Sequence, residues 1–142
     1  MPLTDEDSDV AVLRRNLSAL LQALRTLPVS LVQVRYEGGR GRCRLCEVSL
    51  LPSHSGLMLA TPVAWQRRPA DAGGGQASTV EERVNVEEGL KRFTLHWTSL
   101  QHGHWQRGDG GQGVMRLQVA SGVATLDHDA LHIEQFHATL RE

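Results

Sequence analysis

A cluster of aspartate and histidine in the C-terminal part of the chain is the first candidate for chemistry. Asp127, His128 and Asp129 are consecutive, and His132 follows shortly after. Carboxylates and imidazoles act as general acids and bases and as metal ligands. The sequence pattern places them at a strand end and in a turn, where aspartate is common for turn geometry alone. A surface turn is the simpler interpretation, and a metal-assisted hydrolase that uses Asp127, His128 and Asp109 is the alternative.

Two cysteines three residues apart raise the question of a metal or redox site. Cys43 and Cys46 form a C-x-x-C sequence, which works in either role when a turn brings the sulfur atoms together. Both lie on a predicted strand, where this separation places the side chains on opposite faces. Two unrelated thiols are therefore favoured, and no cofactor is expected. A composite zinc site with His102 and His104 is the alternative, since zinc binds Cys2His2 sets.

Three arginines at the tip of a predicted hairpin could bind phosphate groups. Arg40, Arg42 and Arg44 alternate with glycine and cysteine, and Tyr36 precedes them closely enough to stack on a base. A hairpin tip also explains the glycines, and a chain with a net charge of -1 gains little from counterion release. Weak nucleic-acid binding is therefore the third hypothesis for function.

A leucine-rich stripe predicts a helix near the N-terminus. Apolar residues over 10–27 recur at spacings of three and four, which lines one face of a helix. Ser8 or Asp9 can cap its start, and Pro28 ends it. The stripe is short for a coiled coil, so packing within the chain is favoured. The oligomeric state stays open between monomer and homodimer.

A second apolar stripe predicts a helix over residues 86–100. Asn85 with Glu88 forms a capping box for it, and Ser78 with Glu81 does so if the helix begins earlier. Gly89 weakens its first turn by up to about 1 kcal/mol relative to alanine.

Alternating apolar residues predict antiparallel strands on either side of the second helix. A hairpin with Val32, Val34 and Tyr36 on one face ends before Pro52. Pro62 marks a third strand as an edge or bulged strand. The remaining expected strands cover residues 57–65, 115–119, 123–126 and 131–140. The fold class is α+β, with the order αβββαβββ, an antiparallel sheet of about five to six strands and two helices packed on one face.

Length and composition describe one domain over residues 1–142. The chain is 40% hydrophobic, and a domain of this size needs neither disulfide nor metal to fold. A glycine-rich loop over 66–78 interrupts it without dividing it. No apolar run suffices for a membrane span, and the acidic start is unlike a secretory signal, so a cytoplasmic location is expected.

Motifs spread over the chain resemble a known family. The segment HGHWQRGDGGQG covers residues 102–113, and VATLDH follows over 123–128. Together with the V-x-V-x-Y-x-G hairpin over 32–38, these motifs resemble a bacterial family of small uncharacterised proteins that is common on plasmids and other mobile elements. The family usually carries D-S-G-Q-I after this hairpin, where this chain has arginines over 40–44. The resemblance implies a shared α+β fold and no assigned activity.

Trp105 follows the second predicted helix and has two interpretations. A tryptophan there can tie the end of the helix to the sheet. Alternatively it anchors a recognition patch, since aromatic residues dominate many interfaces. The sequence thus favours a small protein that acts by binding an unknown protein partner in an accessory or regulatory role, with catalysis less favoured. The candidate binding residues are His102, His104, Trp105, Asp109, Arg40, Arg42 and Arg44.

Overall fold

Helices and strands make up most of the part of the chain that the computed structural model describes, which covers residues 9–39, 42–51, 60–67, 80–101, 111–130 and 135–141. The elements are α1 (Asp9–Leu24), β1 (Leu31–Gly39), β2 (Arg42–Leu51), β3 (Pro62–Arg67), β4 (Val80–Asn85), α3 (Val86–Gln101), β5 (Gly111–Gln118), β6 (Val123–Ala130) and β7 (Gln135–Arg141). The α+β fold class is confirmed, with the order αββββαβββ.

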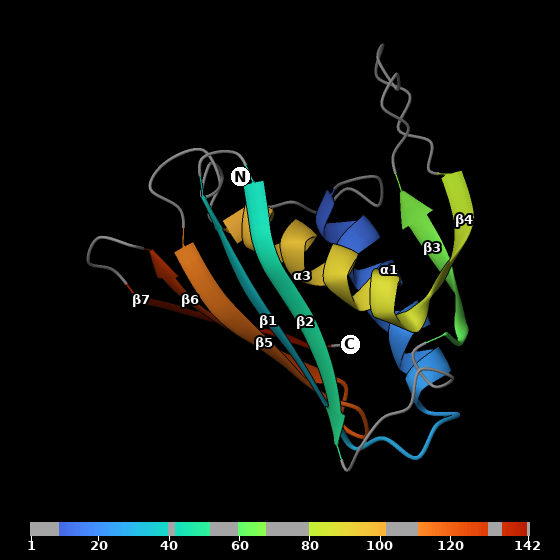
Figure 1. The fold of residues 1–142 in the computed structure, drawn as a ribbon. Helices are drawn as coiled ribbons and strands as arrows, with labels where there is room; N and C mark the ends of the chain where they lie inside the picture. The colour runs from blue at the N-terminus through green and yellow to red at the C-terminus, as the bar shows by residue number, and fades with distance from the viewer. Residues whose placement is uncertain are drawn as a thin grey trace.

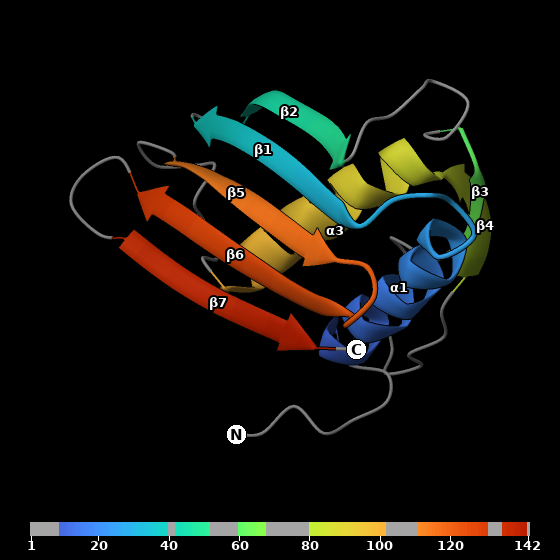
Figure 2. The same ribbon diagram turned by 90° about the horizontal axis from the view of Figure 1, so that it is seen from below.

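The main sheet has five antiparallel strands in the order β2-β1-β5-β6-β7. Strands β3 and β4 form a separate two-stranded sheet. Helices α1 and α3 lie on the same side of the main sheet, and the β3–β4 pair lies beyond them (Figures 1 and 2). The two helices therefore cover one face of the main sheet, as the sequence predicted.

The hydrophobic core lies between this sheet and the helices. The predicted stripes face it, because Leu17 and Leu20 of α1 and Leu90 and Phe93 of α3 are each fully buried. Helix α1 ends at Leu24, before the predicted end, and the chain continues in a turn. The inward residues of the strands complete the core, among them Val32, Val34, Tyr36, Met115, Leu117 and Leu126.

Strand β4 was not predicted, and β3 does not join the main sheet. Only Glu82 and Val84 of β4 are half-buried and the other four residues are exposed, so no apolar side alternates with a polar one strongly enough to indicate a strand. Its valines at 80 and 84 stand at helical spacing. The expectation that Pro62 lies in an edge strand is confirmed, since β3 pairs with β4 alone. Gln66 and Arg67, the first two residues of the predicted glycine-rich loop over 66–78, instead belong to β3, and the rest of that loop lies outside the described residues.

Helix α3 begins as the first of the two capping alternatives predicts. The Oδ1 atom of Asn85 accepts a hydrogen bond from the backbone N–H of Glu88 at 2.7 Å. The Glu88 carboxylate instead binds Arg92 at 2.9 Å, so only half of the capping box forms. Gly89 has a packing role here, since a Cβ atom at this position would lie 2.9 Å from Leu20 Cδ2.

Replacement of Asn85 by alanine is expected to lower the free energy of unfolding by about 1 kcal/mol, because the N–H of Glu88 loses its acceptor. Urea denaturation measures this. Asn85→Asp is the matched control and keeps most of the stability. Equal losses in the two variants would contradict a capping role.

None of the helices within the described ranges is long and apolar enough to cross a membrane.

Candidate functional site

The face of the main sheet that points away from the helices is polar and carries a groove. Alternation along β1, β5 and β6 directs the odd-numbered residues of β1 and β6 and the even-numbered residues of β5 to this side. The groove has a volume of about 350 Å³. Its outward-facing lining consists of Arg35, Glu37, Gln112, Val114, Arg116, Asp127 and Asp129.

Strand register brings one row of these residues together from four strands. Arg35 of β1 pairs with Val114 of β5, which pairs with Asp127 of β6, which pairs with His137 of β7. The Oδ1 atom of Asp127 lies 2.5 Å from Nδ1 of His137, and its Oδ2 atom lies 3.4 Å from Nη1 of Arg116. The Asp127 carboxylate thus bridges a histidine and an arginine.

This face carries charges of both signs, and among the described residues some of these charges form no ion pair. Within the described ranges, the side chains of Arg35 and Glu37 form no ion pair, although both are exposed. Asp127 and Arg116 are about half exposed, at 49% and 46%. Exposed ion pairs contribute at most about 1 kcal/mol, so a partner can replace them at small cost.

The Asp127–His137 pair could also hold a histidine in position for proton transfer. The Nε2 atom of His137 lies 3.4 Å from the hydroxyl of Thr139 on the same strand. The imidazole is 60% exposed, however, so water competes for each of these hydrogen bonds. The arrangement therefore suits recognition by hydrogen bonds better than protected acid–base chemistry.

The structure separates Asp127 from His128. These residues lie within β6 and pair with β5 and β7, which differs from the predicted strand end and turn. Successive side chains on a strand point to opposite faces, so Asp127 is exposed on the outer face while His128 is 1% exposed on the inner one. Asp127 lies beside His137, a pairing that no sequence pattern predicted because it depends on the β6–β7 register.

His128 instead forms a buried pair with Tyr36 of β1. The Tyr36 hydroxyl lies 2.7 Å from His128 Nδ1, and the rings stack with centroids 5.7 Å apart. Gly113 of β5 lies between them in the register, and its missing side chain leaves the space in which the tyrosine crosses β5. Both side chains are 1% exposed, so this pair belongs to the core.

Thr98 of α3 extends this pair to the helix layer. Its hydroxyl donates to the Thr94 carbonyl at 2.7 Å and also hydrogen-bonds Tyr36. Burial raises the pKa of Tyr36 to about 12, and the Thr98 hydroxyl opposes this in part.

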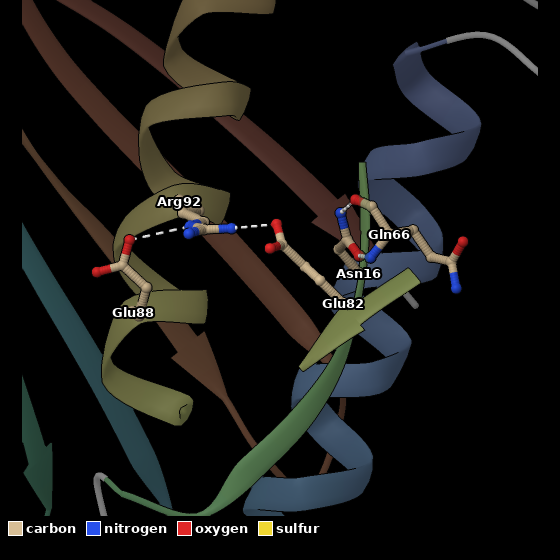
Figure 3. Close-up of polar contacts among 5 residues, drawn as sticks. All are labelled: Asn16, Gln66, Glu82, Glu88 and Arg92. Carbon is tan, nitrogen blue, oxygen red and sulfur yellow. Dashed lines mark hydrogen bonds and ion pairs between the residues drawn. The ribbon is translucent and has the colours of Figure 1, made fainter. Parts of the chain in front are cut away.

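A second polar cluster fixes the β3–β4 pair to the helices (Figure 3). Arg92 of α3 binds Glu88 at 2.9 Å and Glu82 of β4 at 2.6 Å, and these contacts raise its pKa, that with Glu88 most. Nearby, burial lowers the pKa of His96, while Asp9 at 4.0 Å acts in the opposite direction. Because its charges largely satisfy each other, this cluster is structural.

Several predicted site residues lie outside the part of the chain that the structure describes. His102, His104, Trp105, Asp109 and Arg40 lie outside the described residues, as does His132. The backbones of Arg42, Cys43 and Arg44 belong to β2, and their side chains lie outside the description.

The cysteine pair spans an irregularity in β2. The register shifts between Glu37 and Gly38, so that Leu45 pairs with Glu37 and Cys43 pairs with Gly38. Arg44 is the extra residue of this bulge, which interrupts the strict alternation on which the separation of the two thiols was predicted. The half-buried side chain of Cys46 packs against the core. Among the residues that the structure describes, no three metal-binding side chains are grouped together.

Fold and site together define a small α+β protein in which helices cover one sheet face and leave a charged, grooved face exposed. Over residues 12–139 the chain matches a family of unknown function (DUF6878) and therefore belongs to it. No match to a curated protein or to a solved structure was found.

Proposed function

We propose that the protein acts by binding another protein, with the outer face of the main sheet as the contact surface. The observation that carries this proposal is the groove over β1, β5 and β6, which lies on the face opposite α1 and α3. Strands paired on both sides hold the backbone beneath its charged side chains, so that little backbone conformational entropy is lost when a partner binds.

The charge pattern favours a protein over a nucleic acid at this face. Arg35 and Arg116 could bind carboxylates of a partner, while Asp127 and Asp129 could bind its basic residues. A phosphate backbone would meet these carboxylates and that of Glu37 and would be repelled. The nucleic-acid hypothesis therefore depends on Arg40, Arg42 and Arg44 alone.

The same proposal includes an accessory or regulatory role in the cytoplasm of a bacterium. It also includes carriage of the gene on plasmids or other mobile elements. The motifs of residues 102–113 and 123–128 support them by resemblance. The uncovered sheet face supports the binding role in physical terms.

Charge reversal at Arg35 tests the surface. The partner is captured from the native host with the wild-type protein, purified, and titrated against variants. Arg35→Glu is expected to weaken binding about tenfold or more, because a complementary charge pair becomes repulsive. Its thermal stability should match wild type, because Arg35 is exposed and forms no ion pair in the described ranges.

Arg83→Glu on β4 is the matched control, since Arg83 is an exposed strand arginine of the other sheet. It should bind like wild type. Equal affinity of Arg35→Glu and wild type would contradict the proposed surface. Capture of nucleic acid that persists at physiological salt would contradict the proposed class of partner.

A further inference from the structure

We propose that the edge of β3 beside α1 is a second binding site, which takes an extended acidic peptide segment as an added strand at Ala64. This surface lies on the two-stranded sheet and is independent of the outer face of the main sheet.

Asn16 of α1 shows in which direction the backbone of β3 points. Its side chain is 1% exposed. Its Nδ2 donates to the Gln66 carbonyl at 2.8 Å, and its Oδ1 accepts from the Gln66 N–H at 2.8 Å (Figure 3). This pair of hydrogen bonds is the one that a residue of a neighbouring strand would make. The backbone groups of Gln66 therefore point away from β4, toward α1.

The antiparallel register extends this result to Ala64. Residues of an antiparallel strand alternate between pairs that exchange hydrogen bonds and pairs that do not. Gln66 belongs to a pair that exchanges no hydrogen bonds with β4. Ala64 and Pro62 lie two and four residues away, so their pairs exchange none either. Proline has no N–H, which fits a position where the ladder needs none. Thr61 has the other orientation, because its carbonyl accepts a hydrogen bond from the N–H of Val86 at 2.8 Å. The N–H and C=O of Ala64 therefore lie at the outer edge.

A groove lies along this edge. It is shallow and open to solvent, runs between α1 and β3 with a volume of about 460 Å³, and continues toward Pro62 as a smaller hollow of about 220 Å³. Ala64 is exposed, and no described residue hydrogen-bonds its backbone on this side. The small side chains of Ala19 and Ala23 form the floor on the helix, which leaves room for the backbone of an added strand.

The rim of the groove selects the charge of the peptide. Arg14 and Arg15 line it together with Ser18 and Gln22, and none of its described lining residues carries a carboxylate. In β-strand addition, main-chain hydrogen bonds supply affinity and the side chains around the edge supply specificity. Acidic side chains on the peptide would meet these arginines, so an acidic extended segment of a partner protein is the occupant that we infer.

The test uses a short capped peptide of alternating threonine and glutamate, with its threonine–lysine counterpart, and follows the backbone amides of the full chain by NMR. In the free protein the Ala64 amide should exchange with solvent much faster than that of Trp65, which faces β4. The glutamate peptide should shift and protect the Ala64 amide. The lysine peptide should bind at least about tenfold more weakly.

Two variants assign the binding to this edge. Ala64→Pro removes the outward N–H without removing a ladder hydrogen bond, so it should abolish binding of the glutamate peptide while the circular dichroism and thermal melt stay close to wild type. Arg14→Glu should weaken binding. Arg35→Glu, which alters the outer face, should leave it unchanged, so the two proposed surfaces can fail separately.

Equal binding of the two peptides, full binding by Ala64→Pro, or no binding of either peptide would overturn the proposal. Protection of the Ala64 amide that rises with protein concentration and disappears in Ala64→Pro would also overturn it, because a second copy of the chain would then occupy the edge.

Discussion

Replacement of Gly113 by alanine is expected to lower the free energy of unfolding by about 3 kcal/mol, which is a large fraction of the stability of a small domain. A Cβ atom at this position would overlap the carbonyl oxygen of Asp127 and the hydroxyl of Tyr36, and would lie 2.6 Å from the ring carbon Cζ of Tyr36. Relief requires a shift of the β6 backbone or of a buried ring, and neighbouring strands oppose both.

Urea denaturation of Gly113→Ala measures this effect, with Gln112→Ala as the matched control. Gln112 precedes Gly113 on the same strand but is exposed on the outer face, so its replacement should change stability by less than about 0.5 kcal/mol. Adding Tyr36→Phe to Gly113→Ala should recover part of the loss, since the overlap with the hydroxyl disappears while those with the Asp127 carbonyl and the ring carbon Cζ remain. A mild effect like that of the control would show that the tyrosine does not cross β5 at this glycine.

Ionisation of Tyr36 is expected to lower the free energy of unfolding by about 2 kcal/mol as the pH rises from about 10 to about 12. The pKa of Tyr36 is about 12 in the folded chain, because burial disfavours the phenolate. In the unfolded chain it ionises near 10. Between these values the folded state retains a proton that the unfolded state has lost, so rising pH favours unfolding. The contribution is complete below the unfolded pKa and is lost as the pH passes the folded one.

Tyr36 is the only tyrosine in the sequence, so the ultraviolet absorbance of tyrosinate reports this residue alone. Its midpoint in the folded protein should lie well above that of the urea-unfolded protein. Tyr36→Phe leaves a buried imidazole nitrogen without its partner and should cost about 1–3 kcal/mol at neutral pH. Its stability deficit should shrink as the pH rises, because the wild type alone carries the tyrosine ionisation. Coincident midpoints for folded and unfolded wild type would contradict the burial of this hydroxyl.

The elements that the sequence predicts best are those whose apolar residues are strongly periodic. The leucine stripe of α1 and the alternation of Val32, Val34 and Tyr36 each face the core as expected. These patterns depend only on the geometry of one element and on the burial of its apolar side. Strand β4 carries no such pattern, because its side chains are largely exposed and charged, and it was missed.

The site was harder to predict, because contacts across strands create it. Asp127 and His128 are neighbours in sequence, yet the pleat places them on opposite faces. Asp127 pairs with His137 of the next strand. His128 hydrogen-bonds Tyr36, which lies two strands away across a glycine. Only the register of three pairings fixes these partners, and register is a property of the assembled sheet. The alternation of Ala138 and Leu140 toward the core was the one available sign that His137 faces outward.

The strand order also has a consequence for how the chain folds. Strand β1 lies inside the sheet, where Leu31 pairs both with Leu51 of the adjacent hairpin and with Gln118 far along the chain. The N-terminal hairpin therefore has one unsatisfied backbone edge until the C-terminal strands have been synthesised. Pairings between such distant segments slow folding and make it strongly cooperative. Separate N- and C-terminal halves of the protein should consequently be unfolded alone, and should assemble into a sheet only when they meet.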